Sequence, residues 1–281
     1  MACRISTTLT NPTGSVKAAI SPAAFGLARA QALEEKIQEL GPENVAAFIG
    51  EPVQGAGGVI IPPETYWPEI QRICRKYEIL LVADEVICGF GRTGNWWGSD
   101  TFGIEPDLMP IAKGLTSGYV PMGGVFISDR VAEPIIAKGG EFYHGYTYSG
   151  HPLAAAAGLV NLRILQEEKL VDRVGSVTAP YLKSRWEALG DHPLVGEARI
   201  CGLMGALELA ADKETMTPFP DEGTTGSRCR DLSIANGLVM RAVRDSMIIS
   251  PPLIITEAEC DLLVERARKS LDQLAAEIGV G

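Results

Sequence analysis

Hydrophobic residues gather in short runs over the first half of the chain, at residues 45–50, 79–84, 108–112 and 123–128. Segments with helical spacing, at 27–40 and 66–77, come immediately before the first two of these runs. Continuous apolar runs of this length are typical of strands that are covered on both faces. The alternation of helices and strands therefore predicts an α/β fold with a mostly parallel sheet.

The second half of the chain has a different pattern. Its predicted elements are, in order, an Ala-rich helix at 152–168, a helix at 170–189, a strand at 200–209, a polar loop at 212–226, a helix, two strands and a helix at 256–278. This order predicts a small α+β domain over residues 166–281, after a partial large domain over residues 1–165. Residues 1–20 are expected to be unrelated to the large domain or disordered.

The net charge narrows the choice of partners. The 281 residues carry a formal charge of −10, and nucleic acids and anionic membrane surfaces repel an acidic protein, so we expect neither as a partner. No apolar run approaches the roughly 18 residues that span a bilayer. The six cysteines and three histidines lack the paired spacing of a metal site, so no metal is predicted.

The N-terminal region leaves the cellular location open to two interpretations. Residues 1–31 contain basic but no acidic residues and are rich in Ser and Thr, which loosely resembles an organelle transit peptide. The alternative is a disordered or mis-joined N-terminus. Since the chain has no secretory leader pattern, a cytoplasmic location is favoured.

Two charged residues stand at the ends of predicted strands. Asp84 closes the run at 79–84, and Lys113 follows the run at 108–112. Alone, such an Asp is usually a capping or ion-paired residue, and such a Lys is usually solvated. Together they have the residue types that pyridoxal-phosphate (PLP) chemistry requires, because a Lys bonds the cofactor covalently and an acid faces its pyridine nitrogen. The released Lys amine can then act as the base that moves a proton.

Five sequence blocks make this interpretation more specific. In chain order they are Glu51-Pro-Val-Gln-Gly55, Leu81-Val-Ala-Asp-Glu-Val86, Gly89-Phe-Gly-Arg-Thr-Gly94, Ile111-Ala-Lys-Gly114 and Thr147-Tyr-Ser-Gly-His-Pro152. Their order and spacing resemble the class III (omega) PLP-dependent aminotransferases, with a similarity from about residue 30 onward. The resemblance implies the type I PLP-dependent transferase fold, and a homodimer or higher oligomer.

The resemblance also implies roles for individual residues. Lys113 would bond PLP and Asp84 would pair with the pyridine nitrogen. Val86 would pack on one face of the ring, and Thr147 would bind the phosphate from the neighbouring subunit. These roles imply an enzyme that moves an amino group between a small-molecule amine and a 2-oxo acid.

Departures from the family pattern point to one branch. Many members that act on ornithine, acetylornithine or 4-aminobutyrate have Glu at the position of Ala56 and Gln at the position of Ile87. The residues present here resemble the amine/β-alanine:pyruvate branch, which transfers amino groups from primary amines or ω-amino acids to pyruvate. In that branch an Arg at the position of Arg241 binds the acceptor's carboxylate, a contact for which a guanidinium is suited.

One motif is a decoy. The segment Gly89–Gly94 matches the dinucleotide fingerprint G-x-G-x-x-G. However, residues 84–88 separate it from the preceding strand, and residues 95–98 are not expected to begin a helix that could hold a pyrophosphate. A nicotinamide or flavin site is therefore not predicted.

The chain also resembles the family only in part. Full-length members carry an N-terminal portion that supplies a phosphate-binding turn, an aromatic residue that stacks on the ring, and half of the large-domain sheet. Most of it is absent before Glu51, so the chain is interpreted as truncated. Two alternatives stay open: an inactive or cofactor-free fragment, and another class III reaction such as that of an aminomutase.

Overall fold

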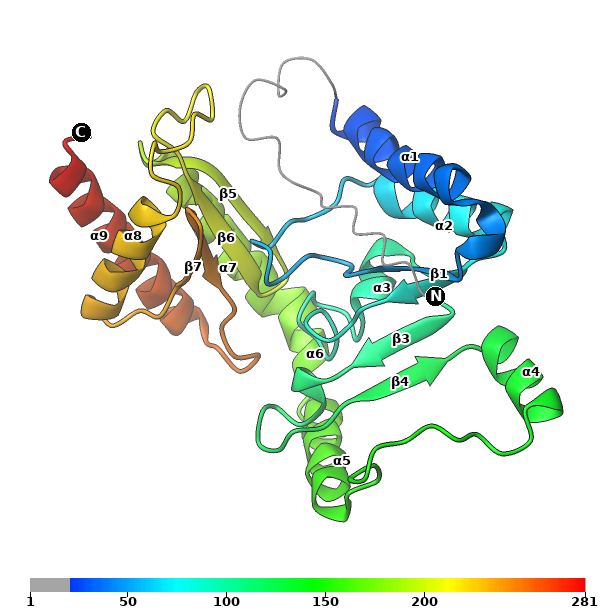
Figure 1. The fold of residues 1–281 in the computed structure, drawn as a ribbon. Coiled ribbons are helices and arrows are strands. Elements are labelled where there is room, and N and C mark those ends of the chain that lie inside the picture. The colour runs from blue at the N-terminus through cyan, green and yellow to red at the C-terminus, as the bar shows by residue number, and fades with distance from the viewer. Residues whose placement is uncertain (1–20, 281) are drawn as a thin grey trace.

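The computed structural model describes residues 21–280 and contains two four-stranded sheets (Figure 1). The first sheet has the order β1 (Ala47–Gly50), β2 (Leu80–Ala83), β3 (Leu108–Ile111) and β4 (Gly124–Ile127). The first three strands are parallel, and β4 runs antiparallel to β3. The four apolar runs thus form the strands of one mixed sheet, as the sequence predicts.

Two helices cover one face of this sheet. They are α1 (Pro22–Leu40) and α2 (Tyr66–Lys76), which lie side by side in Figure 1. The hydroxyl of Ser21 caps α1 by accepting a hydrogen bond from the Ala24 amide, and Pro22 suits the first turn. The core beneath the helices is fully buried and includes Leu33, Ile37, Phe48, Trp67, Ile70 and Ile73.

The other end of the sheet is much more open. All residues of β4 are exposed, and so are those of the segment 136–153, which includes the end of α4 (Asp129–Lys138). The helix α5 (Pro152–Glu167) buries Leu165 in an apolar cluster that includes Ile111, but it exposes Leu159 and Val160. This part of the sheet therefore presents apolar side chains to solvent.

The second sheet is antiparallel and has the order β5 (Val195–Cys201), β6 (Met204–Leu209), β8 (Ser246–Ile249) and β7 (Arg241–Val243). The helices α7 (Ala179–Glu187), α8 (Thr224–Ala235) and α9 (Glu257–Ile278) pack with it around a core that includes Trp186 and Leu207. The single strand predicted at 200–209 is wrong, because Gly202 turns the chain between β5 and β6 with a φ of +58°.

Short elements join these parts. They are α3 (Gly98–Phe102), α6 (Leu170–Arg173), a π-helical turn (Val174–Thr178) and 3₁₀ turns at Pro42–Asn44, Lys113–Leu115 and Ala188–Asp191. A small apolar cluster connects the two sheets, since Val53, Val59 and Cys88 pack with Met204 and Ala206 of β6. The domain boundary near residue 166 stays a prediction, and the interpretation of residues 1–20 lies outside the described residues.

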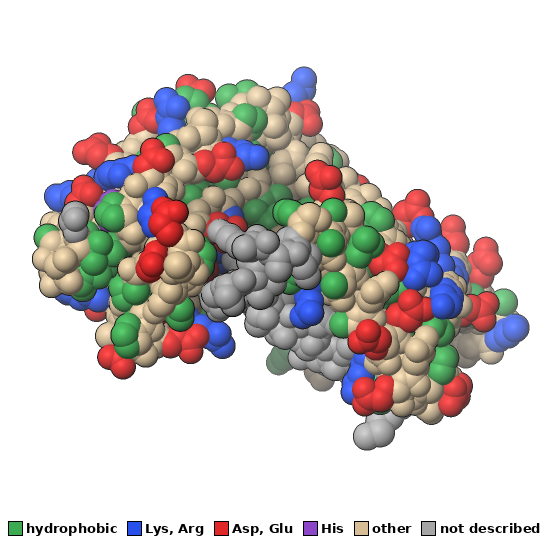
Figure 2. All heavy atoms as spheres, turned by 90° about the horizontal axis from the view of Figure 1, so that it is seen from above, with side chains coloured by type: hydrophobic (Ala, Val, Ile, Leu, Met, Phe, Trp, Pro, Cys, Tyr) green, Lys and Arg blue, Asp and Glu red, His purple; other side chains and the backbone are tan. Residues whose placement is uncertain are grey.

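The surface carries charges of both signs. On the face drawn in Figure 2, Lys and Arg side chains are interspersed with Asp and Glu. Within residues 21–280, no helix combines the length and apolar character needed to cross a membrane. The same residues contain no cluster of three or more His, Cys, Asp or Glu side chains arranged to hold a metal ion.

Candidate active site

Three charged residues follow the carboxyl ends of neighbouring parallel strands: Glu51 after β1, Asp84 after β2 and Lys113 after β3. Gly50 pairs in register with Ala83, and the Asp84 amide donates to the Gly50 carbonyl oxygen at 2.8 Å. Glu51 and Asp84 therefore leave the sheet next to each other. Open α/β sheets bind ligands at this edge.

The carboxylate of Asp84 is held in a defined turn. It is half-buried, and its Oδ1 accepts a hydrogen bond from the Val86 amide at 3.0 Å. The adjacent Glu85 is fully buried and accepts hydrogen bonds from the amides of Gly98 and Ser99 at 2.8 and 2.6 Å. Burial raises the pKa of Glu85 even though these donors favour its charged form. Glu85 thus fixes the backbone immediately after Asp84 by its bonds to Gly98 and Ser99.

Lys113 combines a free amine with a restrained backbone. Its side chain is exposed, and among the described residues its amine has no hydrogen-bond or ion-pair partner. Its φ of +38° is unusual for a residue other than Gly. The Asn161 side chain of α5 donates to the carbonyl oxygens of Gly114 and Leu115 at 2.8 and 3.1 Å. The Lys113 amine is therefore available to form a bond, while the backbone that follows Lys113 is held in place by Asn161.

Glu51 is a third member of this group, and sequence reasoning gave it no role. It is half-buried, and its Oε2 accepts a hydrogen bond from the Gly55 amide at 2.9 Å. Burial raises the pKa of Glu51 and the negative charge of Asp84 adds to the shift, while the Gly55 amide and Lys113 oppose it. A charged residue immediately after a buried strand is the signal that could have identified it.

Ala56 lies in the turn at residues 54–60, other residues of which line a cleft. It is exposed in a turn that Gln54 and Ile60 close by two backbone hydrogen bonds of 3.1 and 3.0 Å. The turn and the second sheet line a cleft of about 630 Å³. Val86 is half-buried beside Asp84.

Two further predicted residues are not brought into contact with Lys113 or Asp84 within the described part of the chain. Arg241 is exposed at the start of β7, opposite Ile248. Thr147 is exposed in the open segment 136–153. Their proposed roles stay predictions.

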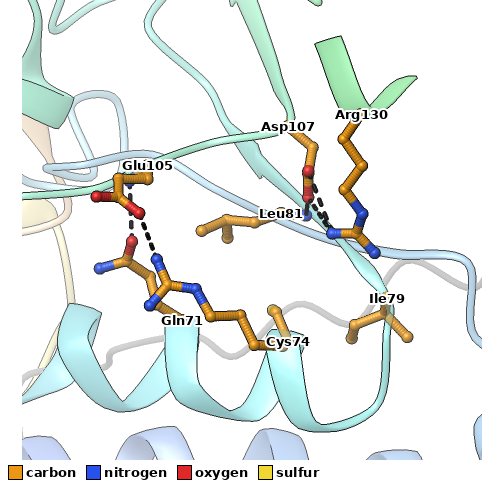
Figure 3. Close-up of a pocket in the computed structure, with 8 residues that line it drawn as sticks. Gln71, Cys74, Ile79, Leu81, Glu105, Asp107 and Arg130 are labelled. Carbon is orange, nitrogen blue, oxygen red and sulfur yellow. Dashed lines mark hydrogen bonds and ion pairs between the residues drawn. The ribbon is translucent and has the colours of Figure 1, made fainter. Parts of the chain in front are cut away.

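Another cavity lies at the opposite edge of the first sheet (Figure 3). Its volume is about 320 Å³, and it lies beside Leu81 of β2 and Asp107, which precedes β3. Arg130 pairs with Asp107 at 3.1 Å, and Asp107 also accepts the Leu81 amide at 2.8 Å. The polar groups drawn there are paired with one another, and the cavity is at the amino ends of the strands, away from Lys113.

A short helix follows the segment Gly89–Gly94, which matches the dinucleotide fingerprint. A helix does begin at Gly98, although it has only five residues. Its first amides already donate to Glu85. The amides that could hold a pyrophosphate are therefore used within the chain, which agrees with the expectation that residues 95–98 begin no helix able to bind one.

A family model described as aminotransferase class III matches residues 11–271. The chain belongs to the class III aminotransferases. The match begins earlier than the position near residue 30 that the motif blocks indicate. Enzymes of this class use PLP, and the mixed α/β fold is that of the type I PLP transferases.

Curated relatives support the same assignment. The chain is 61% identical over 259 residues to a putrescine–pyruvate aminotransferase of Pseudomonas aeruginosa, covering 92% of this chain and 56% of the relative. It is 46% identical to a diaminobutyrate–2-oxoglutarate transaminase of Halomonas elongata, covering 86% and 53%. The chain thus spans about half the length of the curated relatives it matches.

Solved structures of transaminases have the same fold. An omega transaminase from Pseudomonas jessenii in complex with PMP has a TM-score of 0.89 at 45% identity, covering 95% of this chain and 59% of that chain. A transaminase with L-Ala has a TM-score of 0.90 at 42% identity, covering 94% and 63%.

Proposed function

We propose that this chain carries the cofactor lysine and its acidic partner for PLP-dependent transamination. The observation that carries the proposal is the placement of Lys113 and Asp84 after neighbouring strands, with the Lys113 amine unpaired among the described residues. When bound, PLP would supply an electron sink for the electrons of a breaking C–H bond. Asp84 would hold a proton on the pyridine nitrogen, and the Lys113 amine would move a proton between substrate and cofactor carbons.

Other residues would complete the pocket. Val86 would pack on the ring, and Thr147 would bind the phosphate from the neighbouring subunit of a homodimer or higher oligomer. The open segment that carries Thr147 favours this arrangement, because its aromatic side chains, including Tyr146 and Tyr148, are about 80% exposed in the single chain. A cytoplasmic location is part of the same proposal.

The proposed substrates are a primary amine or ω-amino acid and a 2-oxo acid such as pyruvate. The relative from Pseudomonas aeruginosa acts on putrescine and pyruvate by its name, which supports this class. Ala56 and Ile87 favour the same branch, and Arg241 would bind the carboxylate of the acceptor. Ala56 is exposed in the turn at residues 54–60.

The visible absorption spectrum of the chain with PLP tests the proposal. We expect a band that survives desalting, that disappears in Lys113→Ala, and that persists in Lys138→Ala, which removes another exposed lysine. Addition of putrescine alone should then convert the band to that of the aminated cofactor, because a transaminase completes this half-reaction without an acceptor. An aminomutase would not accumulate that form.

One specific observation favours the alternative of a fragment without cofactor. The strand β4 leaves Val125, Phe126 and Ile127 about half exposed, so within the described residues this part of the sheet is not covered. If wild-type chain retains no band after desalting, the transaminase chemistry belongs to the longer relatives and not to this chain.

A further inference from the structure

Arg199 of β5 crosses from the second sheet to the turn that carries Ala56. Its Nε donates to the carbonyl oxygen of Val59 at 2.9 Å, and its Nη2 donates to that of Gly58 at 2.6 Å. The side chain is only 8% exposed. A planar guanidinium can satisfy two backbone oxygens at once in a fixed geometry, which an ammonium cannot do.

Carboxylates hold the guanidinium from the other side. Glu197 lies 3.1 Å from Nη1, and Glu208 lies 2.8 Å from Nη2. Ser246 of β8 donates to the same Glu208 oxygen at 2.5 Å. A buried charge with partners on all sides is fixed in position, because any displacement would leave a charged group without a partner in a low-dielectric environment. The second sheet therefore presents Arg199 to the turn as a rigid group.

Both residues that Arg199 bonds have a positive φ, which glycine adopts readily but valine does not. Val59 has a φ of +53°, which is an outlier for a β-branched residue, and Gly58 has a φ of +124°. Val59 is 1% exposed and packs against Met204 of the second sheet. Such conformations persist only where the surrounding structure imposes them, and they are concentrated at functional sites. Here the surrounding structure consists of Arg199 and the apolar cluster between the sheets.

The strained turn is in direct contact with one carboxylate of the candidate site, that of Glu51. Its Gly55 amide donates to Glu51, whose charge interacts with those of Asp84 and Lys113. Gly55 is also packed so closely that a Cβ there would lie 2.6 Å from the Ile87 side chain. A change in the turn would therefore displace Glu51 and Ile87, the two groups beside the Asp84 segment.

We propose that Arg199 is a positioning residue that holds the turn at residues 54–60 in its strained form and so sets the placement of Glu51 beside Asp84 and Lys113. Through this contact, the small sheet controls the geometry of the site. The effect on the turn stands on the contacts alone, whereas the effect on cofactor binding rests on the proposed function.

Hydrogen exchange of the chain without cofactor tests the effect on the turn. The amides of Gln54, Val59 and Ile60 are hydrogen bonded within it, and the Gly55 amide donates to Glu51. In Arg199→Met we expect these amides to exchange at least about tenfold faster, while those of β6 and β8 keep their protection. Arg199→Lys keeps a charge for Glu197 and Glu208 but cannot donate as a fork, so it should fold and show the same local change.

Arg92→Met is the matched control. Arg92 also connects the chain segment after β2 with the region of the second sheet, because its Nη1 donates to the carbonyl oxygens of Leu203 and Pro251 at 3.4 and 2.5 Å. It does not bond the turn at residues 54–60. Its variant should leave exchange in residues 54–60 unchanged. Unchanged exchange of the turn in a folded Arg199→Lys, or equal changes in both Arg199→Lys and Arg92→Met, would overturn the proposal.

A second measurement follows the cofactor. If the wild type shows the visible band of Lys113-bound PLP, the pH midpoint of that band should move by at least roughly half a pH unit in Arg199→Lys and stay in place in Arg92→Met. A loss of stability alone would not shift this midpoint. An unmoved midpoint contradicts control of the site by Arg199. Absence of the band in the wild type refutes the proposed function, and the exchange experiment still decides the role of Arg199.

Discussion

Asp84 uses one carboxylate oxygen for its own turn and keeps the other without a hydrogen bond among the described residues. Asp84→Asn separates these two tasks, because Asn Oδ1 can still accept from the Val86 amide but the side chain carries no charge. We expect the turn to persist and the amine half-reaction to slow by about 10²-fold or more, since a neutral amide cannot hold the proton on the pyridine nitrogen. Stopped-flow absorbance with putrescine measures the rate, and an unchanged rate would remove Asp84 from the mechanism.

The burial of His192 leads to a prediction of how the free energy of unfolding depends on pH. It is 3% exposed, its Nδ1 accepts from the Leu194 amide at 3.2 Å, and its Nε2 lies 3.3 Å from Asp272. Burial lowers the pKa of His192 from its ordinary value of 6.5, although Asp272 opposes the shift. Below pH 6.5 the unfolded chain therefore binds more protons than the folded chain, and the free energy of unfolding should fall as the pH drops.

Urea denaturation between pH 5 and pH 7.5 measures this dependence. His192→Gln should flatten the decrease below about pH 6.5. His151→Gln removes an exposed histidine and should leave the decrease as in wild type. Equal slopes in all three proteins would show that another group is responsible.

Some residues of the candidate site could be predicted from the sequence, and others could not. Lys113 and Asp84 could be predicted because their chemistry and their places after apolar runs agree. Arg199 could not, because it lies 140 residues from Val59, and only the folded chain brings them together. Glu51 could have been predicted as a site residue, since it follows a strand just as Asp84 does.

At the scale of elements, the turn between β5 and β6 depends on Gly202. A Cβ at this position would lie 2.3 Å from the Arg92 carbonyl oxygen, in addition to the cost of a φ of +58°. Gly103 offers a matched comparison, because it has a φ of +61° and nothing within 4 Å of such a Cβ. Gly103→Ala should cost about 1–2 kcal/mol for the left-handed backbone alone.

Gly202→Ala should therefore reduce the free energy of unfolding by clearly more than Gly103→Ala, by about 3 kcal/mol or more. Urea denaturation of the two variants gives the difference directly. If both variants lose the same free energy, the hairpin accommodates the extra methyl group by moving away from Arg92.

The same hairpin explains why element prediction failed there. The apolar pattern at 200–209 continues through Gly202 and Leu203, and the turn forms because Gly202 packs on the Arg92 backbone, which is distant in sequence. The strands of the first sheet were predicted to within about two residues, because each apolar run is bounded by charged or turn-forming residues. The helix predicted at 170–189 is interrupted by the π-helical turn at Val174–Thr178, a change that spacing alone does not reveal.

At the scale of the whole molecule, the exposed apolar residues are unevenly distributed. The segment 119–164 contains most of the large ones, among them Tyr119, Val125, Phe126, Leu153 and Leu159. The sequence pattern predicted the strands and helices of this region, but it could not show which of their apolar side chains are exposed. The fold places that surface on β4, α5 and the segment between them.

Such a surface predicts self-association of the 30.0 kDa chain, because contiguous apolar patches of this kind mark interaction sites. Light scattering over a range of concentrations should give a mass above that of the monomer. Leu159→Glu places a charge on the open face of α5, where Leu159 is 65% exposed, and should shift the mass toward the monomer. Val239→Glu alters a residue that is 82% exposed outside this segment and should leave the mass unchanged. If both variants behave as the wild type, association does not use this face, and a monomer at all concentrations would contradict the oligomer that Thr147 requires.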